Sequence, residues 1–341
     1  MFIIRKLFIY LVTAISLTII LSACGEKSQE DVIKQMDKQL DEMSGYKAKA
    51  EMKMYTGKED QVYNIDIWHK KKDFYRVALS NNEDEKGNQI ILKNDDGVFV
   101  LTPALDKSFK FQTEWPQNSS QPYLFQSLYQ DIKDDKDATF KVTDSHYVFH
   151  TKTNYQSNNN LPFQEVYIDK KTYVPVLVKV LDKDNQAIVE VKFANFDTKP
   201  SFEDKDFALE ENMSSSAVAE KPVSKDVMDE AFTVLFPEHT AGAELVEQKD
   251  VDLENGQRVI MSYSGDKSFT LIQEKPASVE TLSSPKEVPG DIVNLGHSIG
   301  ALTESGIEWE YNGSTFYLAS DQLTKEELVD IAKSVTGKVV K

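Results

Sequence analysis

The sequence is poor in the residues that crosslink proteins and bind phosphate. It contains one cysteine, Cys24, and only three arginines, Arg5, Arg76 and Arg258, among 39 basic residues. A single cysteine excludes a disulfide within the chain, so stability must come from packing. Few arginines leave little bidentate recognition of phosphate or carboxylate. Because the formal net charge is −17, nucleic acid and anionic membrane surfaces would repel the chain, and we expect no nucleic-acid ligand.

A long hydrophobic run occurs only near the start of the sequence, at residues 7–20. It follows the basic pair Arg5-Lys6 and leads into small residues, which is typical of an export signal over residues 1–23. The segment Leu21-Ser22-Ala23-Cys24 resembles the bacterial lipobox, in which the cysteine is diacylated and becomes the first residue. That resemblance implies a lipoprotein anchored to the outer face of the cytoplasmic membrane through Cys24. The alternative is a plain signal peptide with an incidental cysteine.

After the leader, the pattern predicts one helix followed by a series of strands. Ile33, Met36, Leu40 and Met43 recur at helical spacing behind a possible N-cap, Ser28. From Tyr46 the sequence alternates apolar and charged residues, and this alternation continues in short runs separated by turn residues as far as residue 209. A second helix is expected around residues 123–132. We count about eleven strands and two helices.

Several short segments within these runs resemble the LolA, LolB and RseB superfamily. The likeness covers about residues 29–209 and is closest to the Gram-positive sporulation lipoproteins of the YdcC type. It implies an α+β fold, with an open, strongly curved antiparallel sheet whose concave apolar side is covered by helices. It also implies a role in binding or carrying lipoproteins, lipids or membrane regulators. The segments that carry it are Gly45-Tyr46, Leu101-Thr102-Pro103-Ala104-Leu105, Trp115-Pro116, Asp169-Lys170-Lys171-Thr172, Pro175, Phe193-Ala194-Asn195-Phe196 and Asp206-Phe207.

The remaining third of the chain predicts a linker and a smaller domain. Residues 210–223 are small, polar and without pattern, as in an interdomain linker. From residue 224 we expect a small α+β domain that extends to residue 341. It should open with a helix over residues 226–236, continue in strands, and close with a helix that begins at the capping box formed by Thr324 and Glu327.

No residue pattern points to catalysis, a cofactor or a metal. His146 and His150 have the spacing of zinc ligands on a helix, but they fall in a strand, where they would lie about 13 Å apart. The acidic group Asp131, Asp134, Asp135 and Asp137 lacks the spacing of a calcium loop and is interpreted as a solvated helix end. We find neither a nucleophile elbow nor a phosphate-binding glycine loop. We therefore predict a protein that is not an enzyme.

Two functions remain open. In the first, the protein binds an envelope protein partner, as a regulator or assembly factor, with sporulation as one setting that the YdcC-type resemblance suggests. In the second, it binds a lipid or acyl ligand in an apolar cavity of the curved sheet. A filled core is the commoner fate of such residues, and an open volume of several hundred cubic ångströms would favour the lipid. The side chains expected to line the cavity are Met36, Leu40, Met52, Met54, Ile65 and Val77.

Overall fold

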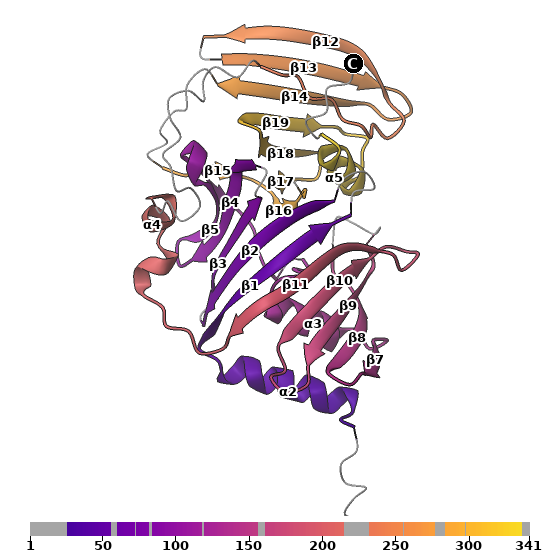
Figure 1. Ribbon diagram of the computed structural model, residues 1–341. Helices are drawn as coiled ribbons and strands as arrows, with labels where there is room; N and C mark the ends of the chain where they lie inside the picture. The colour runs from indigo at the N-terminus through magenta and orange to yellow at the C-terminus, as the bar shows by residue number, and fades with distance from the viewer. Residues whose placement is uncertain are drawn as a thin grey trace, which may run out of the picture.

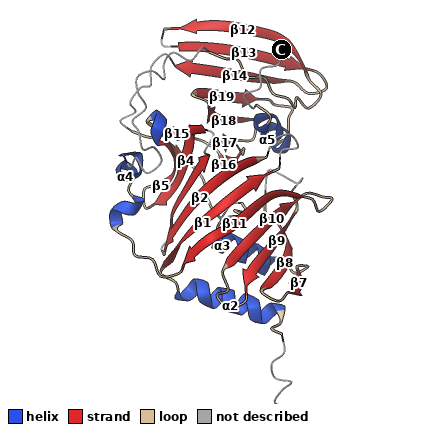
Figure 2. Cartoon of the chain, viewed as in Figure 1, coloured by secondary structure: helices blue, strands red, loops and turns tan. Residues whose placement is uncertain are grey.

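The computed structural model describes residues 26–55, 60–71, 73–81, 84–117, 119–155, 161–214, 232–254, 256–276, 284–296 and 298–335. These residues form two β-sheets, a long one that runs diagonally through Figure 1 and a shorter one at its upper end. Strands predominate over helices throughout (Figure 2). The leader and Cys24 lie outside the described residues. Within the ranges given, no helix is long and apolar enough to cross a membrane.

The long sheet contains the eleven strands expected from the sequence and one strand from the C-terminal part of the chain. Its order is β15-β6-β5-β4-β3-β2-β1-β11-β10-β9-β8-β7. The pairings are antiparallel except for β15, which pairs with β6 in parallel. The strands are β1 (Gly45–Met54), β2 (Gln61–Lys70), β3 (Phe74–Asn81), β4 (Asp84–Asn94), β5 (Gly97–Thr102), β6 (Lys107–Phe111), β7 (Thr139–Val142), β8 (His146–Lys152), β9 (Phe163–Asp169), β10 (Pro175–Leu181), β11 (Ala187–Asp197) and β15 (Lys286–Val288).

The register of this sheet brings the apolar residues of each strand onto one side, which we call the inner face. It is the face that carries Met52, and its side chains join into one core. Alternation with period two causes this, because a strand whose odd and even residues differ in polarity buries only one face. One row of paired residues crosses seven strands from β7 to β2: Phe140, Phe149, Val166, Val178, Val191, Met52 and Tyr63.

Two helices cover one end of the inner face. Helix α2 (Gln29–Glu42) begins at Ser28, which forms a capping box with Asp31, and buries Val32 and Met36. Helix α3 (Phe125–Asp134) buries Phe125, Leu128, Tyr129 and Ile132. Figure 1 shows α2 across the lower strand ends and α3 behind the strands. Both helices occur where the sequence predicts them, because each carries a single apolar stripe.

Among the described residues, a second apolar cluster covers the opposite, outer face over β2–β5. The 3₁₀ helix η2 (Asp204–Phe207) and helix α4 (Leu209–Ser214) pack there against Ile90, Leu92, Phe99 and Leu101. Strands β4 and β5 are therefore apolar on both faces. Arg76 on β3 is buried and donates a hydrogen bond from Nε to Asn212 Oδ1 over 2.6 Å. The sequence therefore places the start of the linker too early. Residues 210–214, which the sequence pattern assigns to the linker, are helical, and Asn212 is buried.

The shorter sheet has the order β12-β13-β14-β19-β18-β17-β16. Helix α5 (Lys325–Lys333), which starts at the predicted Thr324 and Glu327 capping box, packs on it. The helix expected over residues 226–236 is wrong in its described part, because residues 232–236 are not helical. Four short or exposed strands were not predicted: β12, β15, β16 and β17. The sheet's strands are β12 (Glu244–Leu253), β13 (Gly256–Ser264), β14 (Phe269–Pro276), β16 (Asp291–Asn294), β17 (Ile299–Leu302), β18 (Gly306–Tyr311) and β19 (Ser314–Ala319).

The predicted fold class is confirmed: an open antiparallel-rich sheet with covering helices, together with a second, smaller α+β unit. The two units are joined more closely than the sequence predicts. Residues 286–301 belong in sequence to the smaller unit, yet they contribute a strand and core side chains to the larger one.

Candidate functional site

The junction between the two sheets is built from specific polar contacts. Lys107 Nζ on β6 lies 2.6 Å from Glu310 Oε2 on β18, and both side chains are largely buried. The backbone N–H of Ile299 donates to Gln89 Oε1 on β4 over 2.7 Å, also in a buried position. Buried polar groups are costly unless they are paired. These pairs therefore hold the two sheets in one defined arrangement.

The apolar side of the junction closes the second end of the inner face. Val288, Ile292, Ile299 and Ala301 belong to the same buried cluster as Met52 and the rest of the inner-face core. These residues come from β15, β16 and β17, which follow β11 by about ninety residues or more in sequence. The curved face is thus covered by α2 and α3 at one end and by this C-terminal segment at the other.

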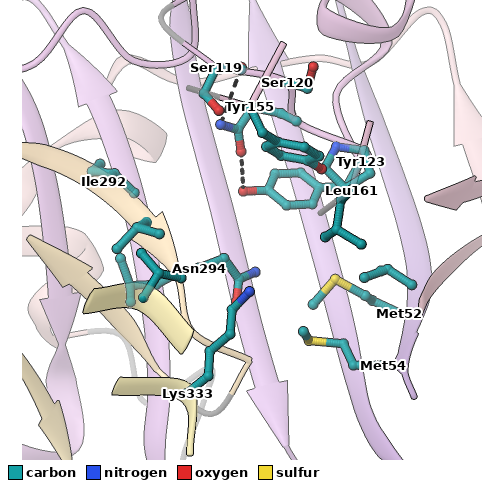
Figure 3. A pocket seen from close by; sticks show the side chains of 16 residues that line it. Met52, Met54, Ser119, Ser120, Tyr123, Tyr155, Leu161, Ile292, Asn294 and Lys333 are labelled. Carbon is teal, nitrogen blue, oxygen red and sulfur yellow. Dashed lines mark hydrogen bonds between the residues drawn. The ribbon is translucent and has the colours of Figure 1, made fainter. Parts of the chain in front are cut away.

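A small pocket lies at the junction, with a volume of about 90 Å³. Its apolar wall comes from β1, β11, β16, β17, α5 and the segment before β9 (Figure 3). At ~15 Å³ for each water, it could hold roughly six waters, which is far less than a typical ligand cavity of several hundred cubic ångströms. The apolar lining residues include Met52, Met54, Leu161, Val189, Ile292, Ile299 and Val329.

The polar part of the pocket is neutral except for one lysine. Lys333, in the last turn of α5, extends into the pocket beside Asn294 (Figure 3). Burial lowers the pKa of its amine, and the nearby Asp330 carboxylate opposes that effect. Tyr123 donates a hydrogen bond to Gln121 Oε1 over 2.8 Å, and Asn294 Oδ1 accepts one from the Gly296 N–H over 2.7 Å. The pocket therefore combines an apolar floor, oriented neutral dipoles and a single amine.

A second feature is an open polar groove of about 820 Å³ beside α3 and β8. Asp131, Asp134, Asp135 and Asp137 line it, together with two lysines, Lys136 and Lys152. Lys152 forms an ion pair with Asp137, with 2.7 Å between Nζ and Oδ2. The groove is accordingly acidic overall.

Asp131 differs from a solvated helix end. Its Oδ2 accepts hydrogen bonds from Ser120 Oγ over 2.8 Å and from Gln164 Nε2 over 2.7 Å. Burial nevertheless raises the pKa of Asp131 to about 6, because the charged carboxylate is poorly solvated there. The expectation that all four acids are solvated is therefore wrong for Asp131 and also for Asp135, whose side chain is 7% exposed and accepts hydrogen bonds from Thr151 Oγ1 and the Lys152 N–H.

The residues predicted to line a cavity lie in different environments. Met52 and Met54 line the small pocket. Met36, Ile65 and Val77 are fully enclosed in the core, with at most 2% of each exposed. Leu40 is half-buried and packs against the same core. Cys24 lies outside the described residues.

Sequence reasoning missed Lys333 and Asn294. Lys333 follows the apolar stripe of a predicted helix and reads as an ordinary charge in its last turn, while Asn294 lies in a four-residue strand without a clear pattern. Only the packing of one sheet on the other brings them to Met52. His146 and His150 both lie on β8. Among the residues that the structure describes, no three His, Cys, Asp or Glu side chains form a possible metal site.

Comparison with known proteins connects this architecture to a family. The family model described as sporulation protein YdcC-like matches residues 4–207, more than half of the chain. Sporulation protein YdcC of Bacillus subtilis is 46% identical over 336 residues, which is 98% of either protein.

Solved structures with lower similarity include a chain of the Pseudomonas aeruginosa MucA/MucB complex. It is 12% identical and has a TM-score of 0.33, covering 90% of this chain and all of that one. A LolA superfamily protein from Nitrosomonas europaea is 8% identical, with a TM-score of 0.31, over 54% of this chain and 99% of that one. The extent and identity of the sequence matches decide the assignment: the chain belongs to the YdcC-like family of sporulation proteins.

Proposed function

We propose that the protein is a lipid-anchored, non-catalytic binding protein of the cell envelope that holds a protein partner during sporulation. The sporulation role rests on the name of the Bacillus subtilis relative, which is similar along the whole chain. The anchor rests on the lipobox-like Leu21-Ser22-Ala23-Cys24. Two acyl chains would keep such a protein at the outer face of the cytoplasmic membrane.

The observation that carries the choice of a protein partner is the filled inner face. Its residues form a continuous core with α2, α3 and the segment that includes β15–β17. The pocket left there measures about 90 Å³. A diacyl lipid would need the core to open, at the cost of exposing well-packed apolar side chains to water. A binding function is then expected at the surface rather than inside the sheet.

The acidic groove is the surface that we assign to the partner. It is open, it measures about 820 Å³, and its aspartates outnumber its lysines by four to two. A segment with basic side chains would gain favourable electrostatic contacts there, and these would also steer its approach. Helix α3 supplies five of the residues that line the groove and β8 supplies Lys152, while most of the others belong to the connecting segments on either side of α3 and after β8.

Site-specific crosslinking in intact sporulating cells would test this proposal. A photo-reactive amino acid at Gln130, an exposed groove residue, should give one discrete crosslinked product. Asp134→Asn with Asp137→Asn should weaken that product without altering protein levels. The matched control is the same amino acid at Asp95, in the exposed turn between β4 and β5. Equal products at both positions, or none at Gln130, would contradict the groove as the partner surface.

The anchor has its own test. Cys24→Ser should move the protein from the membrane to the soluble fraction. Ser22→Ala keeps a small residue before the cysteine and should leave the protein at the membrane. Retention of the Cys24→Ser protein would contradict acylation as the anchor.

The lipid function remains the second candidate, because Met52 and Met54 do line a pocket. Native mass spectrometry of the full-length protein, purified gently from its own envelope, distinguishes the two. A co-purifying lipid of stoichiometric amount would favour lipid handling and would mean that the core opens. Protein without lipid would favour the partner.

A further inference from the structure

The pocket at the junction has an unusual charge for this protein. Acidic residues outnumber basic ones by 56 to 39 in the whole sequence. Of the 16 residues that line the pocket, all within the described ranges, Lys333 alone is charged. Its amine lies on the pocket side of α5, beside Asn294 (Figure 3). A lone cation in a poorly hydrated site favours an anion as its counterpart.

Among the residues that the structure describes, none provides Lys333 with a counterion at contact distance. In the part of the chain that is described, its amine forms no ion pair within 4.0 Å and no hydrogen bond. Asp330, three residues earlier on α5, attracts the amine from further away. The position in the last turn of α5 gives some stabilisation from the helix dipole, but the amine extends into the pocket. A bound anion would supply the missing partner.

Neutral donors surround the same space. The Tyr155 hydroxyl forms no hydrogen bond with the described residues, and it lies on the far side of the pocket from Lys333 (Figure 3). Asn294 is oriented by its bond from the Gly296 N–H. Beside them, on the right of Figure 3, lie the side chains of Met52, Met54 and Leu161. The pocket thus presents polar donors on two sides and an apolar floor.

We propose that this pocket binds the carboxylate of a short aliphatic group, with the Lys333 amine pairing with the carboxylate and the methionine-rich floor contacting the aliphatic part. A volume of about 90 Å³ admits a branched chain of a few carbon atoms but excludes a whole lipid or a sugar chain. A zwitterion would lack an acidic partner for its ammonium group. A phosphate group would find neither an arginine nor a helix N-terminus among the lining residues.

Two sources could supply this chemistry, a free short-chain acid or the last residue of a peptide. Either ligand would touch β1 of the long sheet and β16 and α5 of the short one. Its binding would strengthen the junction that Lys107, Glu310, Gln89 and Ile299 already hold. The pocket adjoins the acidic groove and shares Ser119 with it, but its charged group is Lys333, whereas the groove carries the four aspartates.

Methionine-methyl NMR on the full-length protein in detergent tests the proposal directly. Isovalerate should shift the methyl signals of Met52 and Met54 saturably and leave that of the enclosed Met36 in place. Isovaleramide, which has the same shape without the charge, should bind at least about tenfold more weakly. An acetylated tripeptide ending in valine, with its amidated form as control, tests the second source. Binding of the free acid, the peptide or both supports the site and identifies the source.

The matched variants are Lys333→Met and Lys325→Met. Lys333→Met should weaken the acid by about tenfold or more while the protein stays folded, because it removes a poorly solvated charge. Lys325 lies on the same helix and pairs with Glu304 outside the pocket, so its substitution should leave binding unchanged. The proposal is overturned if neither acid nor peptide shifts Met52 and Met54, if the amide binds equally well, or if Lys333→Met binds as the native protein does.

Discussion

The two ends of the inner face are closed by very different parts of the chain. At one end, α2 and α3 lie close in sequence to the strands they cover. Both helices can be predicted from the sequence because each carries an apolar stripe. At the other end, the cover comes from residues 286–301, which have no such stripe and reach the face from the second sheet. The first cover is amphipathic and depends on apolar burial together with the buried Tyr46 hydroxyl, which accepts from the Phe125 N–H and donates to Gln126 Oε1. The second combines burial with the paired groups Lys107–Glu310 and Ile299–Gln89.

This difference teaches that an open, curved sheet need not contain a lipid cavity. When a second unit inserts strands over the open end, the apolar face becomes the core of a larger protein. What remains is a pocket at the seam, where residues from both sheets meet. The seam is therefore the place where a small ligand could act on both units at once.

The largest expected effect follows from breaking the buried pair at the second end. Lys107→Ala leaves the carboxylate of Glu310, which is only 7% exposed at its side chain, without its cation. We expect a loss of about 3 to 5 kcal/mol in the free energy of unfolding, measured by urea denaturation. Lys110→Ala on the same strand is the control and should cost less than about 1 kcal/mol. Hydrogen exchange should rise in β16 and β17 but not in α2. An equal rise of hydrogen exchange in α2 and in β16 and β17 would mean that the two covers unfold as one unit.

The corresponding change at the first end is Met36→Ala. Met36 is fully buried, so truncation removes apolar contacts and leaves a cavity under α2. We expect a loss of about 3 kcal/mol, with faster exchange in α2 and α3 and little change in β16 and β17. Lys34→Ala, exposed on the same helix, should change stability by less than about 0.5 kcal/mol. A stability loss in Met36→Ala as small as that of the control would show that α2 is not part of the core.

A finer test of the second end is Gln89→Leu. The substitution keeps the side-chain size but removes the acceptor of the Ile299 N–H, which is buried. An unpaired buried donor should lower stability by about 2 kcal/mol, seen as a lower urea midpoint with an unchanged slope. Gln257→Leu, on the exposed side of β13, serves as control. A neutral effect at Gln89 would indicate that another acceptor or water replaces the side chain.

The smallest expected effect is the dependence of the free energy of unfolding on pH, through Asp131 on α3. In the unfolded chain the pKa of Asp131 is near 3.8, and burial raises it to about 6 in the folded protein. The folded state therefore binds the proton more tightly. The stability from this group is fully present below about pH 4 and is lost as the pH rises through 6.

Asp131→Asn should remove this dependence. When the pH is raised from 5 to 7.5, the free energy of unfolding of the variant should therefore rise by roughly 1 kcal/mol relative to that of the native protein. Burial lowers the pKa of His69 to about 4, which gives the opposite slope in both proteins and cancels in the comparison. Chemical denaturation at the two pH values measures the difference. A constant difference between the proteins would contradict the raised pKa of Asp131.

Much of the fold was predictable because local patterns carry it. The period-two alternation from Tyr46 and the stripe that includes Met36 specify which side of each element is buried, before any tertiary contact is known. The capping boxes at Ser28 and Thr324 mark where two helices begin. The likeness to the YdcC-type family then follows from the order of these elements, and it is confirmed by the family match.

The site was predictable only in part, since Met52 and Met54 line the pocket but Met36, Ile65 and Val77 do not. An apolar face that is predicted from the sequence indicates that the face will be buried, but it does not identify the segment that covers it. Strands of three or four residues, such as β15 and β16, carry too few residues to show a period.

The sequence by itself determined strands β1–β11, helices α2, α3 and α5, and the lipobox-like segment at Cys24, because each depends on neighbouring residues. Only the tertiary structure decided how the open end of the sheet is closed and that Lys333 meets Met52 and Met54 in one pocket. Those outcomes depend on contacts between residues more than 170 positions apart. The physical reason is that burying apolar surface is favourable against any surface of complementary shape. That complementarity is a property of two folded units and not of either segment alone.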